Sequence, residues 1–209
     1  MSKTIIFDTE SLSCPPAEAE KFMPTTWPTG NTKDPAKLAA AIEEKKKAWL
    51  EDGALNPLTS RVLAIGLLVS DTFVLIGPPA TEAEILHEFW DAVRDGDGIH
   101  KLVGFNVCGF DLPLLCRSSY RLGVPVPSAL REGRYWSRSV IDLRDLWTFN
   151  DRQAVGSLDT VAKYFGVGAK TGSGADFAAL WQTDRPKAEA YLKNDLSITA
   201  AIARKLGVI

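Results

Sequence analysis

The order of the hydrophobic segments constrains the fold of this chain most strongly. Short apolar runs rich in β-branched residues, typical of buried strands, stand at 4–8, 61–69, 72–76, 101–105 and 139–143. Longer stretches with helical periodicity stand at 81–95, 111–122, 157–165, 176–182 and 186–206. Strands dominate the first half and helices the second, with alternation between them. This order predicts an α/β domain with a mixed central β-sheet flanked by helices.

Local signals mark where several of these segments begin and end. Ser70 and Asp71 form a tight turn between two of the strands, which predicts a β-hairpin. Thr81 and Glu84 have the spacing of a capping box at the start of the first helix. Gly123 follows the second helix and is expected to end it.

Composition favours one soluble domain. The 209 residues, 45% of them hydrophobic, suffice for one core, so we expect a single domain over 1–209. The cysteines (Cys14, Cys108 and Cys116) form no CxxC pair, which favours a reducing compartment. The sequence shows neither a charged leader with an apolar signal region nor an apolar run near the ~18 residues of a membrane span. We therefore expect a cytoplasmic protein that contacts no membrane.

The charge of the chain excludes a strongly basic nucleic-acid binder. The formal net charge is −2 and the isoelectric point is about 5.8. Nucleic acid is not excluded as a partner, because metal ions offset the carboxylates that bind them and a local basic patch can still hold phosphates.

One segment, 12–60, does not fit the alternation of strands and helices. Its prolines stand at 15, 16, 24, 28, 35 and 57. It contains one clear helical pattern, with Asp34 as N-cap, Pro35 in the first turn and Gly53 after the end, and with Leu38, Ile42 and Trp49 on one face. We interpret this segment as an insertion between the first two strands, within the single domain.

Acidic residues lie at or just after the ends of two predicted strands. Asp8 and Glu10 are two residues apart, so on a strand their side chains point to the same face and repel unless a cation lies between them. The alternative is a solvated strand end. Asp111 opens a helix after a buried strand, where α/β domains place their sites. The alternative there is an ordinary helix cap, with Pro113 in the first turn.

The last predicted helix carries an acidic residue inside its apolar face. That face consists of Leu192, Leu196, Thr199, Ile202, Ala203 and Leu206. Asp195 falls within it, and a buried charge is costly unless it is paired or bound to metal. Tyr191 lies one turn earlier, so its hydroxyl can reach the same neighbourhood. The alternative is a tilted helix with Asp195 at its rim.

Together these residues resemble one family. The motifs are Phe7-Asp8-Thr9-Glu10, Asn106-x3-Phe110-Asp111 and Tyr191-x3-Asp195. In this order they are similar to the DEDD exonuclease superfamily, tyrosine subtype, and in particular to the proofreading exonuclease domain of family B DNA polymerases and its stand-alone relatives. The surrounding residues agree: Gly104-Phe105-Asn106, Phe110-Asp111-Leu112-Pro113, Ser157-Leu158-Asp159 and Lys193-Asn194-Asp195-Leu196.

The resemblance implies a ribonuclease H-like fold and 3′→5′ removal of nucleoside monophosphates by two divalent metals. It implies that Asp8, Glu10 and Asp195 hold the metal that activates water, and that Asp8 and Asp111 hold the second. Tyr191 would orient the attacking water. An all-oxygen site favours Mg²⁺ or Mn²⁺ over zinc. His87 and His100 lie far from Tyr191 in sequence and are interpreted as structural or exposed.

Further residues are expected to bind substrate. By the same resemblance, Thr9, Asn106 and Phe110 would contact the terminal nucleotide. The loop 166–172 fails as a P-loop because Ala169 stands where glycine is needed and a helix precedes it, but Lys170 could still contact phosphate. Residues 112–141 contain arginines at 117, 121, 131, 134 and 138, interleaved with Tyr120, Tyr135 and Trp136. They predict a track for single-stranded nucleic acid or, alternatively, a solvated basic face.

Three functions are compatible with these features. We expect a free-standing exonuclease acting on single-stranded 3′ ends, of DNA in preference to RNA. One alternative is a non-catalytic nucleic-acid-binding accessory module of a replication or repair complex. Another is a hydrolase of short oligonucleotides, which the acidic isoelectric point leaves open.

Overall fold

The computed structural model describes residues 2–29, 34–149, 151 and 156–209. The chain packs as two compact units: Met1–Glu10 with Val62–Ile209, and Ser11–Arg61. The segment that we expect to be an insertion falls within the second unit. Whether the whole chain acts as one domain stays a prediction.

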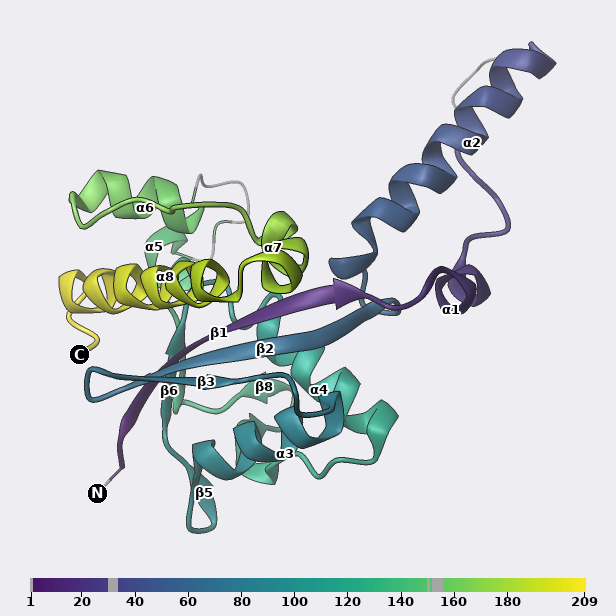
Figure 1. Ribbon diagram of the computed structural model, residues 1–209. Coiled ribbons are helices and arrows are strands. Elements are labelled where there is room, and N and C mark those ends of the chain that lie inside the picture. The colour runs from purple at the N-terminus through teal and green to yellow at the C-terminus, as the bar shows by residue number, and fades with distance from the viewer. Residues whose placement is uncertain (1, 30–33, 150, 152–155) are drawn as a thin grey trace. The chain divides into compact units, whose positions relative to one another are not determined.

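The larger unit is built on a five-stranded sheet with the strand order β3-β2-β1-β6-β9 (Figure 1). The strands are β1 Thr4–Ser13, β2 Ser60–Val69, β3 Thr72–Ile76, β6 Lys101–Gly104 and β9 Val140–Asp142. β2 and β3 are antiparallel, whereas β1 and β6, and β6 and β9, are parallel. The sheet is therefore mixed, as the sequence predicts, and the carboxyl ends of β1, β6 and β9 meet at one edge.

Except for α5, the helices of this unit begin and end close to the predicted positions. They are α3 Glu82–Val93, α4 Asp111–Leu122, α5 Leu143–Thr148, α6 Leu158–Phe165, α7 Phe177–Thr183 and α8 Arg185–Lys205. The capping box of Thr81 and Glu84 is formed, and Gly123 ends α4 with a left-handed φ of 70°. Ser70 and Asp71 also have positive φ, as a tight hairpin turn requires. The caps and turns that the sequence predicts are confirmed.

Short elements complete the unit. Two-residue strands form two hairpins: β4 Arg94–Asp95 with β5 Gly98–Ile99, and β7 Arg131–Glu132 with β8 Tyr135–Trp136. Single 3-10 turns lie at η3 Ser128–Leu130 and η4 Gly174–Asp176. Among the described residues, no helix is both long and apolar enough to cross a bilayer.

Both faces of the sheet are covered by helices. Ile5 and Phe7 of β1 pack in one apolar cluster with residues of α3 and α4, whereas Ile6 packs in another with residues of α6 and α8. Figure 1 shows α3 and α4 on one side of the sheet and α6 and α8 on the other. On β2, a Cβ at Gly66 would lie 2.8 Å from side-chain carbons of Leu192 and Leu196. This glycine therefore lets α8 lie close against the sheet.

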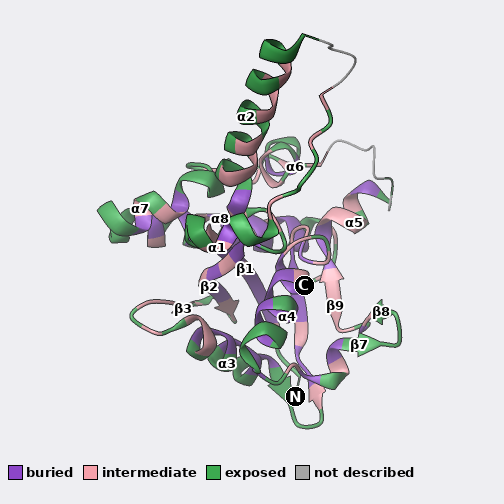
Figure 2. Ribbon diagram, turned by 90° about the vertical axis from the view of Figure 1, so that its right-hand side faces the viewer, coloured by how far each residue is buried: buried purple, intermediate pink, exposed green. Residues whose placement is uncertain are grey.

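The smaller unit contains two helices, α1 Pro16–Ala19 and α2 Pro35–Glu51, and the 3-10 turns η1 Glu20–Phe22 and η2 Asp52–Ala54. α2 starts as predicted: the Asp34 carboxylate accepts hydrogen bonds from the backbone N–H groups of Ala36 (2.9 Å) and Lys37 (3.4 Å). None of its residues is buried (Figure 2). Leu38, Ile42 and Trp49, the apolar face that the sequence indicates, are partly exposed.

Two expectations about the elements need correction. The first strand does not end at Asp8 but continues to Ser13, so Glu10 lies on a strand rather than at the start of a loop. Polar residues interrupt the hydrophobic run there, although the backbone stays extended. Helix α5 was not predicted, because six residues are too few to show a helical period.

Candidate active site

Asp8 and Glu10 project from the face of β1 that α8 covers. They lie two and four residues after Ile6 on the strand, so their side chains point to the same face as Ile6, which packs in the cluster of α6 and α8. Asp8 is partly exposed, whereas Glu10 is 6% exposed. In register, Ile6 lies opposite Val103, so both carboxylates stand beyond Gly104, where β6 ends. The pair therefore lies at the edge where the parallel strands end.

Asp111 reaches β1 from α4. The backbone N–H of Thr9 donates a 2.9 Å hydrogen bond to Asp111 Oδ1, and Asp111 is 4% exposed. The N-cap of α4 is Phe110, and no side chain caps this helix. The alternative of an ordinary cap is therefore wrong: the Asp111 carboxylate faces the strand between Asp8 and Glu10.

Asp195 is buried inside the fold, on α8. It is 1% exposed, so the alternative of a residue at the helix rim is also wrong. Lys170 Nζ lies 2.5 Å from Asp195 Oδ2. Asp195 Oδ1 has no hydrogen-bond partner within the described ranges. A buried carboxylate oxygen without a partner is costly and indicates a ligand that satisfies it.

Tyr191 and Glu10 approach the same position. A Cβ placed on Gly174 would lie 3.7 Å from Glu10 Oε2 and 3.9 Å from the Tyr191 hydroxyl. The Tyr191 ring also packs on Phe177, with 5.9 Å between the ring centroids. A Cβ on Gly172 would lie 3.2 Å from Tyr191 Cδ2. The loop before α7 therefore lies against the ring and holds its hydroxyl toward the carboxylates.

Burial raises the pKa of all four carboxylates, and neighbouring carboxylates add to the rise at Asp8, Glu10 and Asp111. Burial and the charge of Asp195 raise the pKa of Asp8 to about 6, although this residue keeps some solvent exposure. Burial and Asp8 raise the pKa values of Glu10 and Asp111 well above their usual range. Burial also raises the pKa of Asp195, while Lys170 opposes the rise. Buried like charges of this kind mark a site for cations or for proton chemistry.

The structure brings only some of the predicted substrate residues to the carboxylates. Thr9 contacts Asp111 and Lys170 contacts Asp195. Asn106, with a left-handed φ of 63°, lies in the loop before α4, and Phe110 packs partly buried against the core on the α3 and α4 side. These two residues are placed near the site by the chain that joins them to Asp111, and their roles stay predictions.

Arg117 and Arg121 of the predicted track lie on α4, Arg131 and Arg134 lie in the hairpin of β7 and β8, and Arg138 follows β8. Within the hairpin, Arg131 stacks on Trp136 at 4.5 Å and Arg134 on Tyr135 at 4.8 Å. The hairpin precedes the start of β9, and its Tyr135 and Trp136 line a cavity with Cys108, Asp142 and Asp145. A nucleic-acid track along these residues stays a prediction. Of the histidines, His87 is exposed and His100 is buried, where its Nδ1 accepts a hydrogen bond from the Lys3 N–H.

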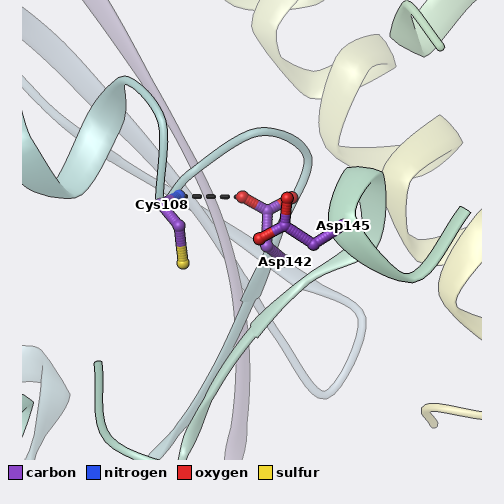
Figure 3. A group of neighbouring side chains, drawn as sticks. All are labelled: Cys108, Asp142 and Asp145. Atoms are coloured by element: carbon purple, nitrogen blue, oxygen red, sulfur yellow. Dashed lines mark hydrogen bonds between the residues drawn. The ribbon is translucent and has the colours of Figure 1, made fainter. Parts of the chain in front are cut away.

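A second polar cluster lies beside the site. The atoms of Cys108, Asp142 and Asp145 that could bind a metal all lie within 4.8 Å of one another (Figure 3). Within the described residues, the four predicted carboxylates do not form such a close group. Asp142 already accepts hydrogen bonds from the backbone N–H groups of Asn106 (2.8 Å), Cys108 (2.8 Å) and Arg144 (2.9 Å). Burial and Asp142 raise the pKa of the Cys108 thiol to about 12. This cluster is therefore better explained as a clamp on the loop before Asp111 than as a metal site.

Replacing Asp142 tests this clamp. Asp142→Ala removes the acceptor of three backbone N–H groups, so we expect a loss of about 3 kcal/mol in the free energy of unfolding. Asp145→Asn, which changes a partly exposed neighbour, is expected to cost less than about 0.5 kcal/mol. Urea unfolding measures both. Equal losses for the two variants would contradict the clamp. Sequence reasoning missed Asp142, and the available signal was its position as N-cap of α5.

The comparisons with known proteins agree with this architecture. The structure is similar to that of the family B DNA polymerase from the hyperthermophilic archaeon Pyrobaculum calidifontis, with a TM-score of 0.66 and 23% identity. The match covers 99% of this chain and 24% of the polymerase, and it shows the fold, which is ribonuclease H-like. An uncharacterized protein of Methanocaldococcus jannaschii is 38% identical over 72 residues, 34% of this chain and 39% of that protein.

The matched part thus covers less than half the length of either relative. Residues 59–199, more than half of the chain, match a family described as predicted 3′-5′ exonucleases related to the exonuclease domain of PolB. The chain belongs to this family of PolB-related predicted exonucleases.

Proposed function

We propose that this protein is a metal-dependent 3′→5′ exonuclease that hydrolyses single-stranded nucleic acid, DNA in preference to RNA, to nucleoside 5′-monophosphates. The observation that carries the proposal is the meeting of Asp8 and Glu10 from β1, Asp111 from α4 and Asp195 from α8 at one edge of the sheet. Membership of the exonuclease family supports it.

The residues present fit two divalent metals. All the candidate ligands are carboxylate oxygens, which suit Mg²⁺ or Mn²⁺. Asp195 Oδ1 has no hydrogen-bond partner among the described residues, and burial together with Asp8 raises the pKa values of Glu10 and Asp111, as expected where buried carboxylates lie close together. Asp8, Glu10 and Asp195 would hold one ion, and Asp8 with Asp111 the other. When bound, such a pair supplies a nucleophilic water at neutral pH and stabilises the leaving oxygen.

The protein side chains would position the reacting groups. Burial raises the pKa of Tyr191 above its usual value, so its hydroxyl keeps its proton at neutral pH and can orient the attacking water by hydrogen bonding. The Lys170 ammonium, 2.5 Å from Asp195, is within reach of a phosphate that binds at the carboxylates. Thr9, Asn106 and Phe110 would contact the terminal nucleotide from β1 and from the loop before α4.

The first experiment is a degradation assay on single-stranded DNA and single-stranded RNA. A 5′-labelled single-stranded DNA, run beside its RNA copy with Mg²⁺ or Mn²⁺, is expected to shorten one nucleotide at a time. The ladder should disappear with EDTA and in Asp8→Ala, because Asp8 would serve both metals. The strand that shortens faster, DNA or RNA, is the preferred substrate. Tight strand binding without turnover in Mn²⁺ would overturn the proposal in favour of an accessory binding module.

A length series of substrates tests the substrate class. We expect long single strands to be degraded at least as fast per nucleotide as di- and trinucleotides. Activity confined to the shortest substrates would instead make the protein a hydrolase of short oligonucleotides. A role in replication or repair would follow from a preference for DNA 3′ ends.

A further inference from the structure

We propose that Lys170 and a divalent metal ion exchange at Asp195. In the metal-free protein the Lys170 ammonium pairs with Asp195, and it leaves Asp195 when the metal binds. Lys170 thereby sets the metal affinity of the site. This inference rests on the metal site of the proposed function.

The Lys170 ammonium occupies one oxygen of Asp195, a carboxylate that would bind metal. Nζ lies 2.5 Å from Oδ2, and the Asp195 side chain is 1% exposed, whereas that of Lys170 is 26% exposed. The ammonium also lies 5.2 Å from the centroid of the Tyr191 ring. A divalent ion bound to Asp195, even through the free Oδ1, would lie close to the ammonium on Oδ2, and two cations on one carboxylate repel each other. Metal binding at Asp195 therefore favours the departure of Lys170.

The loop between α6 and α7 fixes the position of Lys170. The backbone N–H of Lys170 donates a 3.0 Å hydrogen bond to Asp159 Oδ1 on α6. Asn194 Nδ2 on α8 donates a 3.2 Å hydrogen bond to the carbonyl of Ala169. Gly168 has a φ of 137°, which only glycine adopts readily. These contacts hold the backbone, so the exchange needs only a rotation of the lysine side chain.

The charge of Lys170 reaches beyond Asp195. It lowers the pKa of Asp8 and of Glu10 as well as that of Asp195, against burial and mutual repulsion. One ammonium thus serves three of the four carboxylates. After exchange, the displaced ammonium stays tethered at the rim of the site, where it is free to meet the phosphate of a substrate.

Substitution of Lys170 tests the exchange without any nuclease assay. Lys170→Met keeps an unbranched chain of the lysine's length up to Cε and removes the charged ammonium. We expect it to bind Mn²⁺ about tenfold more tightly than the wild type, because no ion pair must break and no cation remains nearby. In EDTA the variant should unfold at a lower temperature than the wild type, and Mn²⁺ should raise its unfolding temperature by more.

Lys193→Met is the matched control, because Lys193 is exposed on the same helix as Asp195 and the change in net charge is identical. Isothermal titration with Mn²⁺ and thermal unfolding are measured on all three proteins without nucleic acid. An unchanged or weaker Mn²⁺ affinity in Lys170→Met, or an equal gain in Lys193→Met, would overturn the exchange.

A second neutral variant and the wild-type titration separate a failure of folding or of the metal site from a failure of the exchange. If Lys170→Met does not fold, Lys170→Gln, which is also neutral but can hydrogen-bond, replaces it in the same titration. If the wild type itself binds no Mn²⁺, the proposed metal site fails. If the wild type binds Mn²⁺ and the neutral variants bind it no better, only the exchange fails.

Discussion

Asp195→Asn is expected to lower the exonuclease rate by about a thousandfold or more, because it removes a carboxylate that would hold a metal ion. Asparagine has the shape of aspartate, so the packing around this buried position on α8 is kept. Tyr191→Phe is expected to lower the rate only about ten- to a hundredfold, because the hydroxyl positions a water without supplying charge.

Single-turnover degradation of a labelled single strand in saturating Mg²⁺ measures both rates. Lys193→Met, exposed on the same helix, serves as the control and should retain the wild-type rate. Near wild-type rates for both Asp195→Asn and Tyr191→Phe would refute the assignment of the site to these residues. A much larger loss for Tyr191→Phe than for Asp195→Asn would instead make the hydroxyl the dominant group.

The second large effect concerns pH in the absence of metal. The folded protein binds more protons than the unfolded chain between the ordinary aspartate pKa of 3.8 and the Asp8 pKa of about 6. Its stability is therefore highest below this interval and falls as the pH rises through it. Glu10 and Asp111, whose pKa values are also raised, act in the same direction. Because of these groups, we expect the EDTA-treated protein to unfold at a higher temperature near pH 5 than near pH 7.

Metal binding should show the opposite dependence, because protons and metal ions compete for the same oxygens. Thermal unfolding across this pH range, with EDTA and with Mn²⁺, checks both slopes. Asp8→Asn cannot ionise, so its metal-free stability should depend less on pH than that of the wild type. If stability in EDTA rises with pH in the wild type and in Asp8→Asn alike, the site carboxylates are not the groups that control it.

Much of the fold could be predicted because local and tertiary preferences agree. The hairpin of β2 and β3 combines alternating or continuous apolar residues with a turn whose residues accept positive φ. Helix α3 has a capping box and a continuous buried face from Ile85 to Val93. Asp195 stood out because a charge within an apolar face is locally unfavourable, and such conflicts mark functional positions.

Other parts could not be predicted, because they depend on contacts between distant segments. The polar end of β1 carries no apolar alternation to reveal the strand. The sequence places Asp142 in the predicted strand 139–143, and only the fold shows that it caps α5 and binds the backbone of the loop before Asp111. The sequence suggested a phosphate contact for Lys170, whereas its ion pair with Asp195 depends on the packing of α6 against α8.

The exposure of helix α2 has a practical consequence. None of its 17 residues is buried, so it is held by its Asp34 cap and by local ion pairs such as Lys46 with Glu43. A helix of this length is only marginally stable by itself, and its solvent-facing positions tolerate change at little cost. α2 is therefore a suitable place to attach a fluorophore or a spin label, because a probe there reports on the smaller unit without replacing a buried residue.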